Sequence, residues 1–156
     1  EKQCNLYYTV ATNYQEEIQM AVVVELLRSE ADGAISFGNH KLQQKAKVED
    51  FEHEGDMLKV KTYQAMTKLE KNGMFLYESV PGTSVLAFHE SEKGVEFVAE
   101  GNGDAQITIG LMDDTEYEVF VGNESIGTMR TGLGGKLSLS VELEEDKEVP
   151  VKVRQV

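Results

Sequence analysis

The 156-residue sequence contains one cysteine, no tryptophan, two prolines and three histidines. The lone cysteine, Cys4, excludes an intrachain disulfide framework and a metal site built from several cysteines. It favours a reducing cytoplasm, although a surface protein of an anaerobe has the same cysteine content. Without tryptophan, only tyrosine and phenylalanine remain to stack on sugars.

Long apolar runs are also missing. The longest one, residues 20–24, has five residues, far fewer than the roughly 20 that span a bilayer. Residues 1–19 lack the basic start and apolar middle of a signal peptide. We therefore expect no membrane span and no signal peptide in this chain.

Positive charge is scarce, since 15 basic residues face 28 acidic ones and the net charge is −13. A surface this acidic repels phosphate backbones, so nucleic acid is not an expected partner.

Short alternating segments dominate the chain. From residue 95 onward they are separated by turn-forming residues and spaced by about ten positions, at 95–100, 105–111, 116–121, 125–131, 136–143 and 148–155. This spacing is typical of an antiparallel sandwich or barrel. The sequence therefore predicts an all-β protein of ten to twelve strands, with one short helix near residues 13–20 as an option.

A hairpin is predicted at Met66–Lys71 and Met74–Val80, because Asn72-Gly73 is the preferred two-residue turn between strands. The good helix formers of residues 64–71 leave one helical turn there as an alternative.

Two interpretations compete for residues 18–28, an amphipathic helix and a strand from about Met20. Three consecutive valines favour the strand. We expect an N-terminal extension over 1–19 and a single β domain over 20–156, with a weaker boundary near Gly94. Met20 is a candidate natural start of the protein.

Two acidic stretches contain histidine, Glu52-His53-Glu54 and His89-Glu90. Neither has the two histidines four positions apart that a helical zinc site needs, so surface or packing roles are expected.

Three loops resemble binding motifs and are predicted to be turns. Residues 132–136 lack the spacing of a phosphate-binding loop. Residues 101–104 and Asp113-Asp114 could supply oxygen ligands to calcium. They flank one predicted strand and would lie at its opposite ends, so we do not expect them to form one calcium site together. Asn123-Glu124-Ser125 is a glycosylation sequon at a predicted hairpin tip.

Catalytic motifs are not found. There is no Gly-x-Ser-x-Gly nucleophile turn, and carboxylates are too numerous for one pair to stand out. We therefore predict a protein that is not an enzyme, with no catalytic residues, no metal and no cofactor.

Seven short motifs carry a family resemblance: residues 34–38, 47–51, 59–62, 67–74, 77–83, 104–108 and 134–138. With these motifs the chain from about residue 20 onward resembles a family of small acidic β-rich proteins from Gram-positive anaerobes. Some members carry the name endosialidase. Sialidase-type enzymes have tryptophan-containing turns and an arginine cluster, whereas Arg28, Arg130 and Arg154 lie in different predicted elements here. No catalytic residue of that kind can be assigned to this sequence.

The first functional hypothesis is a non-catalytic structural or protein-interaction module. A homo-oligomer through a sheet edge or face is the expected assembly. Acidic residues would discourage open-ended stacking near one end: Glu142, Glu144, Glu145 and Asp146. The alternatives are a carbohydrate-binding or accessory module, with an exposed row of Tyr and Phe, and a glycan hydrolase of the endosialidase type.

Overall fold

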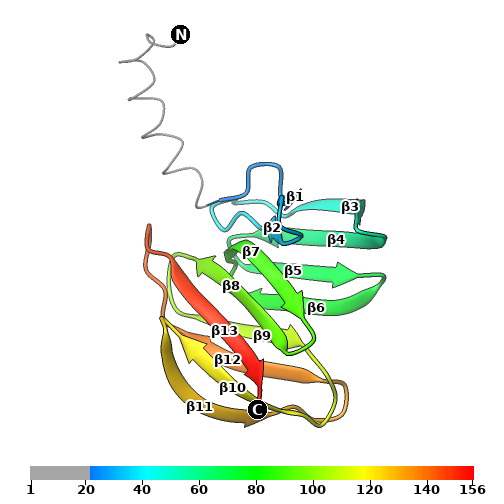
Figure 1. Ribbon diagram of the computed structural model, residues 1–156. Helices are drawn as coiled ribbons and strands as arrows, with labels where there is room; N and C mark the ends of the chain where they lie inside the picture. Colours follow the sequence, from blue (N-terminus) through cyan, green and yellow to red (C-terminus); the bar gives the residue numbers. More distant parts are fainter. Residues whose placement is uncertain (1–21) are drawn as a thin grey trace, which may run out of the picture.

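The computed structural model describes residues 22–156, and these residues form thirteen strands in two antiparallel sheets (Figure 1). In spatial order, sheet A contains β1 (Leu27–Ser29), β2 (Ile35–Phe37), β7 (Ser84–Ser91), β8 (Gly94–Glu100), β13 (Val149–Gln155), β10 (Glu116–Val121) and β11 (Glu124–Arg130). Sheet B contains β12 (Lys136–Val141), β9 (Ala105–Gly110), β6 (Met74–Val80), β5 (Met66–Lys71), β4 (Asp56–Tyr63) and β3 (Ala46–His53).

The two sheets pack through the apolar residues that alternate along their strands. At the centre lie three phenylalanines of sheet A and Tyr77 of sheet B, with ring centroids 5.2–6.1 Å apart. Most of these ring pairs meet edge to face, an arrangement that stabilises aromatic clusters. The sandwich is therefore held by one apolar layer between its sheets.

The all-β prediction is confirmed, and the predicted strands from residue 95 onward match β8–β13 within two residues. The number of strands was underestimated, because thirteen are present rather than ten to twelve. The alternative of a helical turn at residues 64–71 is wrong, because Met66–Lys71 is strand β5 and pairs with β4 and β6. Pairing on both sides outweighs the local helical preference.

The Asn72-Gly73 hairpin is confirmed. Both residues take positive φ, 53° and 79°, as this turn requires. Asn72 also donates from its side-chain amide to Asp56 at 2.9 Å and accepts the Met57 backbone N–H at 2.9 Å, which ties the turn to the start of β4.

The strand predicted from Met20 is wrong where the structure describes it. Residues 22–26 form one turn between two bends, and β1 begins only at Leu27. Leu26 takes a positive φ of 72°, and its N–H donates to the Val23 carbonyl at 2.8 Å. Neither a helix nor a strand continues through these residues, because the chain turns to place Val23 and Leu27 in the interior and Val24 in solvent.

The predicted extension over 1–19 and the helix near 13–20 lie outside the described residues. Within 22–156 no helix is present that could cross a membrane.

The sheets meet along two sides of the sandwich. On one side β1 lies against β3, and residues 38–45 carry the chain from β2 to β3. On the other side residues 131–135 carry the chain from β11 to β12. These sides lie at opposite ends of the sheets in Figure 1. We call them the β1–β3 side and the β11–β12 side.

Candidate functional site

The free edges of the sheets are the main candidate site, because an edge strand presents unpaired backbone donors and acceptors. Four strands have one neighbour each among the described residues: β1 and β11 in sheet A, and β3 and β12 in sheet B. Proteins usually protect such edges with short strands, bulges, charges or proline. Three of the four edges here have such protection, and β12 does not.

Strand β12 is short, regular and closely alternating. Its sequence Lys-Leu-Ser-Leu-Ser-Val buries every second side chain, and its pairing with β9 has no register shift. It contains no proline and no acidic residue. Sheet B therefore ends in a strand without a bulge, which a further strand could extend.

The residue just before β12 shows which residues of the strand direct their backbone N–H and C=O toward β9 and which direct them away. We call this alternation the backbone phase of β12. The Leu111 N–H donates to the Gly135 carbonyl at 2.7 Å, so these two residues form a hydrogen-bonded pair. Every second residue after Gly135, starting with Leu137, then directs its N–H and C=O toward β9. Ser138 and Ser140 lie in the opposite phase, so their backbone groups point away from the sheet.

Lysine at an edge usually discourages pairing, but Lys136 is turned away from the edge. Its ammonium lies over the Phe75 ring, 4.6 Å from the centroid, and Phe75 belongs to β6, two strands further into sheet B. The side chains of the two serines also form hydrogen bonds with side chains of β9. Ser138 Oγ pairs with Thr108 Oγ1 and Ser140 Oγ donates to Gln106 Oε1, both at 2.8 Å. The serine side chains thus lean toward β9 and leave the backbone edge uncovered.

Strand β11, the neighbouring edge in sheet A, is protected by irregularity. A bulge interrupts its pairing with β10 near Val119 and Phe120, and Gly127 takes a φ of +110° within the strand. Bulges increase local twist and end regular pairing. At the end of β11, Arg130 Nε binds Asp114 at 2.9 Å.

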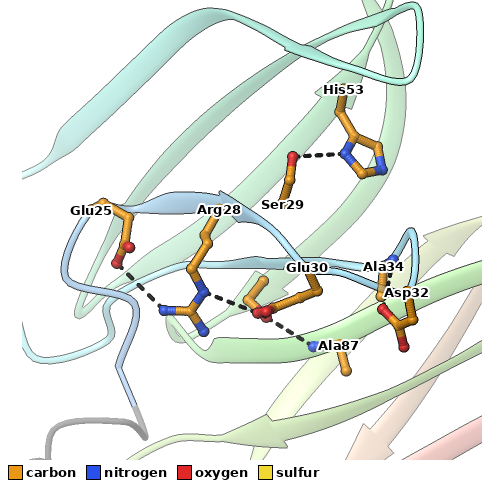
Figure 2. Close-up of polar contacts among 9 residues, drawn as sticks. Glu25, Arg28, Ser29, Glu30, Asp32, Ala34, His53 and Ala87 are labelled. Atoms are coloured by element: carbon orange, nitrogen blue, oxygen red, sulfur yellow. Dashed lines mark hydrogen bonds and ion pairs between the residues drawn. The ribbon is translucent and has the colours of Figure 1, made fainter.

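The β1–β3 side is joined by a histidine. His53, the last residue of β3, places Nδ1 2.8 Å from Ser29 Oγ of β1, as Figure 2 shows, and Nε2 2.9 Å from the Gly33 carbonyl. The carbonyl can only accept, so Nε2 carries a proton and donates it. In the neutral ring Nδ1 then accepts the Ser29 hydroxyl proton. Both ring nitrogens therefore connect sheet A to sheet B.

Strand β3 carries further protection. A bulge lies between Val48 and Phe51, with Asp50 at a φ of 57°, and two more acidic side chains, Glu49 and Glu52, belong to the strand. Strand β1 has three residues only. Short length, a bulge and acidic charge together make both edges of this side poor templates for another strand.

A polar network fixes the β1–β2 turn beside His53 (Figure 2). Glu30 accepts hydrogen bonds from Ser36 Oγ at 2.5 Å and from Arg28 Nε at 3.0 Å, and Ser36 Oγ also accepts the Ala87 N–H at 3.0 Å. The Ser36 hydroxyl, followed by Arg28, holds the pKa of Glu30 below its ordinary value, although burial opposes this shift. Ser36 is 1% exposed, so its hydroxyl is not open to a substrate.

Both predicted histidine stretches reach one small hollow on the β1–β3 side. It has a volume of about 230 Å³, and its polar lining includes His53, Glu54, Asp56, Lys71 and Glu90. The Lys71 ammonium contacts both oxygens of Glu90, at 3.1 and 3.2 Å, and Asp56 accepts from Asn72. The hollow is smaller than typical ligand pockets, about 300–1,000 Å³. Its His53, Asp56, Lys71 and Glu90 side chains already have hydrogen-bond or ion-pair partners.

A larger hollow of about 460 Å³ lies on the outer face of sheet A. It spans β7, β8, β13 and the β10–β11 hairpin, and its lining includes Phe120, Asn123, Glu96 and Lys152. Its size and its mix of aromatic, amide and charged groups fit a small polar ligand.

Three outward-facing aromatic rings each have a cation close to the ring. Lys45 lies 5.8 Å from the centroid of Tyr63, and Arg154 lies 5.9 Å from that of Phe120. Phe75 has Lys136 over it, as described above. These three rings belong to β4, β6 and β10, which lie in two different sheets, so they do not form one continuous row on a single sheet face.

Two interior polar groups have an atom without a hydrogen-bond partner among residues 22–156: His40 Nε2 and Glu100 Oε2. Burial lowers the pKa of His40 to about 4, and its Nδ1 lies 2.7 Å from Ser84 Oγ. Burial raises the pKa of Glu100, and the nearby acidic groups Glu148 and Asp146 raise it further. Because both side chains are buried, a change in their protonation changes the stability of the fold.

The remaining predicted motifs are turns. Residues 132–136 connect β11 to β12 and end at its first residue. Residues 101–104 and Asp113-Asp114 lie at opposite ends of β9, as predicted. Asn123 takes a φ of 71° in the β10–β11 hairpin, which accounts for asparagine there. His89 is exposed on β7, and Cys4 lies outside the described residues.

In residues 22–156 no group of three or more His, Cys, Asp and Glu side chains has the arrangement of a metal site. Comparison of the chain with protein-family profiles, with curated proteins and with solved structures found no match. The resemblance to the endosialidase-named family therefore stays a prediction.

The sequence contained a partial signal for the β12 edge. The alternation of residues 136–141 predicts a strand with a polar face, but the position of that strand in the sheet depends on pairing with residues 105–110. The role of His53 had no local signal, because its partners Ser29 and Gly33 lie 24 and 20 positions earlier.

Proposed function

We propose that this protein is a non-catalytic protein-interaction module that binds an extended strand along the free edge of β12. The observation that supports this most is the contrast among the four edges. Bulges, acidic charge or short length protect β1, β3 and β11, whereas β12 is regular and the ammonium of its only lysine lies over Phe75.

Strand addition at such an edge uses ordinary backbone chemistry. An incoming strand pairs with the N–H and C=O groups of Ser138 and Ser140, and each backbone hydrogen bond contributes about 0.5–1.5 kcal/mol net. Alternate side chains of the partner then contact Leu133, which is 95% exposed just before β12, and the outer face of sheet B. Main-chain pairing supplies affinity, and these side-chain contacts supply selectivity.

We propose no catalysis because the side chains that could react are buried or already bonded to other groups. His53 uses both ring nitrogens to join the sheets, Ser36 is buried, and Glu90 is paired with Lys71. A glycan hydrolase needs a general acid and a second carboxylate that are free to act across a bound sugar. The paired groups of the 230 Å³ hollow leave that alternative disfavoured.

A phage-displayed library of random dodecapeptides tests the proposal. The full chain is used as bait beside two variants, Ser140→Pro and Ser140→Ala. Proline removes the outward N–H, whereas alanine keeps it and removes only the hydroxyl. We expect peptides with alternating apolar residues that bind the wild type and Ser140→Ala and lose at least ten-fold in affinity for Ser140→Pro. Failure to select any peptide that distinguishes the two variants would contradict the proposal.

Carbohydrate binding is the second candidate function, and the hollow on the outer face of sheet A favours it. Its volume of about 460 Å³ suits one or two sugar rings, and Asn123 and Lys152 supply polar contacts. A glycan array probed with wild type and Phe120→Ala tests this alternative. It predicts binding that Phe120→Ala reduces, and the absence of any bound glycan rejects it.

A further inference from the structure

We propose that the strand received by β12 is β12 of a second copy, paired antiparallel about a two-fold axis at Leu139. This inference rests on the proposed function, because it assumes that the β12 edge is the docking surface. It adds the identity of the partner, the direction of pairing and the register.

The backbone phase limits the registers that are allowed. The Leu111–Gly135 hydrogen bond places the outward N–H and C=O groups on Lys136, Ser138 and Ser140. Two copies pair only when outward residues face outward residues. With the axis at Leu139, Ser138 lies opposite the partner's Ser140, and each such pair exchanges two backbone hydrogen bonds. The phase requirement is then met along the whole strand.

The charges at the ends of β12 favour this direction and register. Lys136 begins the strand, and Glu142, which is exposed, follows its last residue. Antiparallel pairing about Leu139 brings Lys136 opposite the partner's Glu142 at both ends, so the ammonium that lies over Phe75 in the single chain turns toward that carboxylate. Parallel pairing instead places like charges side by side. Moving the axis to Ser138 pairs Lys136 with the partner's Ser140 and leaves both charges unmatched. The sequence of β12 is thus complementary to itself in one register.

The apolar side of the strand is self-complementary as well. Leu137, Leu139 and Val141 point into the sandwich and are 1–3% exposed. In the proposed register Leu139 meets its own copy on the axis, and Leu137 lies opposite the partner's Val141. Cross-strand pairs of this kind stabilise sheets. The two copies then form one continuous sheet through both B sheets.

Light scattering coupled to size-exclusion chromatography of the full chain, over a range of concentrations, is the first test. We expect a mass that rises toward twice the 17.4 kDa of one chain as the concentration increases. Ser140→Pro is expected to remain monomeric, and the matched control Ser140→Ala is expected to associate as the wild type does. Far-UV circular dichroism confirms that both variants keep the β fold.

Charge reversal tests the register independently of proline. Lys136→Glu and Glu142→Lys, each alone, place like charges at both ends of the interface, and we expect each to weaken association roughly 2- to 30-fold. The double variant Lys136→Glu/Glu142→Lys restores unlike pairs and is expected to return within about 3-fold of the wild type. Additive losses in the double variant would overturn the register.

A chain that stays monomeric at all concentrations overturns the pairing of two copies. The proposed function stands in that case if displayed peptides still bind the wild type and lose binding to Ser140→Pro. It falls as well if no such peptide is found. A dimer that Ser140→Pro leaves intact also overturns the inference, because the contact then lies elsewhere.

Discussion

The two sides of this sandwich differ in how their edge strands are protected from pairing with another chain. On the β1–β3 side, His53 joins the sheets through both ring nitrogens, and the edges are short, bulged or acidic. On the β11–β12 side, the strands are joined by the five-residue connection 131–135, and β12 ends sheet B without a bulge or an outward charge. The difference shows that edge protection here is selective. One side is built to remain closed, and one strand of the other is left able to pair.

Polar residues follow the same division. Two of the three histidines and the Glu30–Ser36 network lie on the β1–β3 side or in its crossover, where they bond across elements. The side chains of β12 bond only along its own sheet, to Thr108 and Gln106. Substitutions on the first side should therefore reduce stability, and substitutions at the β12 edge should change association instead.

The largest effect is expected from acid titration of His40. Its pKa is about 4 in the folded protein and about 6.5 when unfolded, so the unfolded chain binds the proton first as the pH falls. The stability due to the neutral ring is complete above pH 6.5 and is lost between pH 6.5 and 4, by up to about 3 kcal/mol.

Urea unfolding of the wild type and His40→Gln across this pH range measures the loss. The difference in unfolding free energy between the two proteins should change steadily between pH 6.5 and 4. A difference that is independent of pH would show that His40 titrates normally in the folded protein.

The next effect concerns His53. Replacing it with alanine removes two hydrogen bonds between the sheets, and we expect the free energy of unfolding to fall by about 2 kcal/mol. His89→Ala is the matched control, because His89 is exposed on β7 and should cost less than about 0.5 kcal/mol. Chemical denaturation measures both, and equal losses in the two variants would contradict the role given to His53.

A smaller loss is expected at the β1–β2 turn. Glu30→Gln weakens the bonds from Ser36 and Arg28, and we expect a loss of about 1 kcal/mol at neutral pH. The pKa of Glu30 is lowered in the folded protein, so this contribution should disappear as the pH falls below about 4.5. Denaturation at pH 7 and pH 3 checks the sign, and a loss that grows in acid would exclude this account.

The smallest change in stability is expected at the β12 edge. Ser138→Pro removes an outward N–H that has no bond to β9, so the free energy of unfolding of the isolated chain should change by less than about 1 kcal/mol. The same substitution at Leu139 removes a bond to β9 and should cost about 3 kcal/mol or more. Similar losses at both positions would mean that the backbone phase of β12 is assigned wrongly.

Much of the fold could be read from local pattern. Asn72-Gly73 predicts its hairpin because both residues tolerate positive φ, and the alternation of residues 136–141 matches their burial. Gly94 lies in β8, where an added side-chain carbon would come within 1.8 Å of the Val153 carbonyl oxygen. The sequence around Gly94 could not predict this contact, because β13 is distant from Gly94 in the sequence.

The candidate site was less predictable for the same reason. A homo-oligomer through an edge could be expected of any open sandwich, but the strand concerned depends on sheet order. β12 is an edge because the chain crosses from sheet A after β11, pairs beside β9 and then returns to sheet A as β13. The direction of Lys136 over Phe75 likewise depends on two strands 61 positions apart in sequence.

Amide hydrogen exchange along β12, measured by NMR at low and at high protein concentration, tests the central claim most directly. The account predicts that the N–H groups of Leu137 and Leu139 are protected at both concentrations, because they bond to β9. The N–H groups of Ser138 and Ser140 should exchange rapidly in dilute solution and become protected when the protein is concentrated. Rapid exchange of both serine amides at every concentration would contradict the claim that β12 is the edge through which this protein associates.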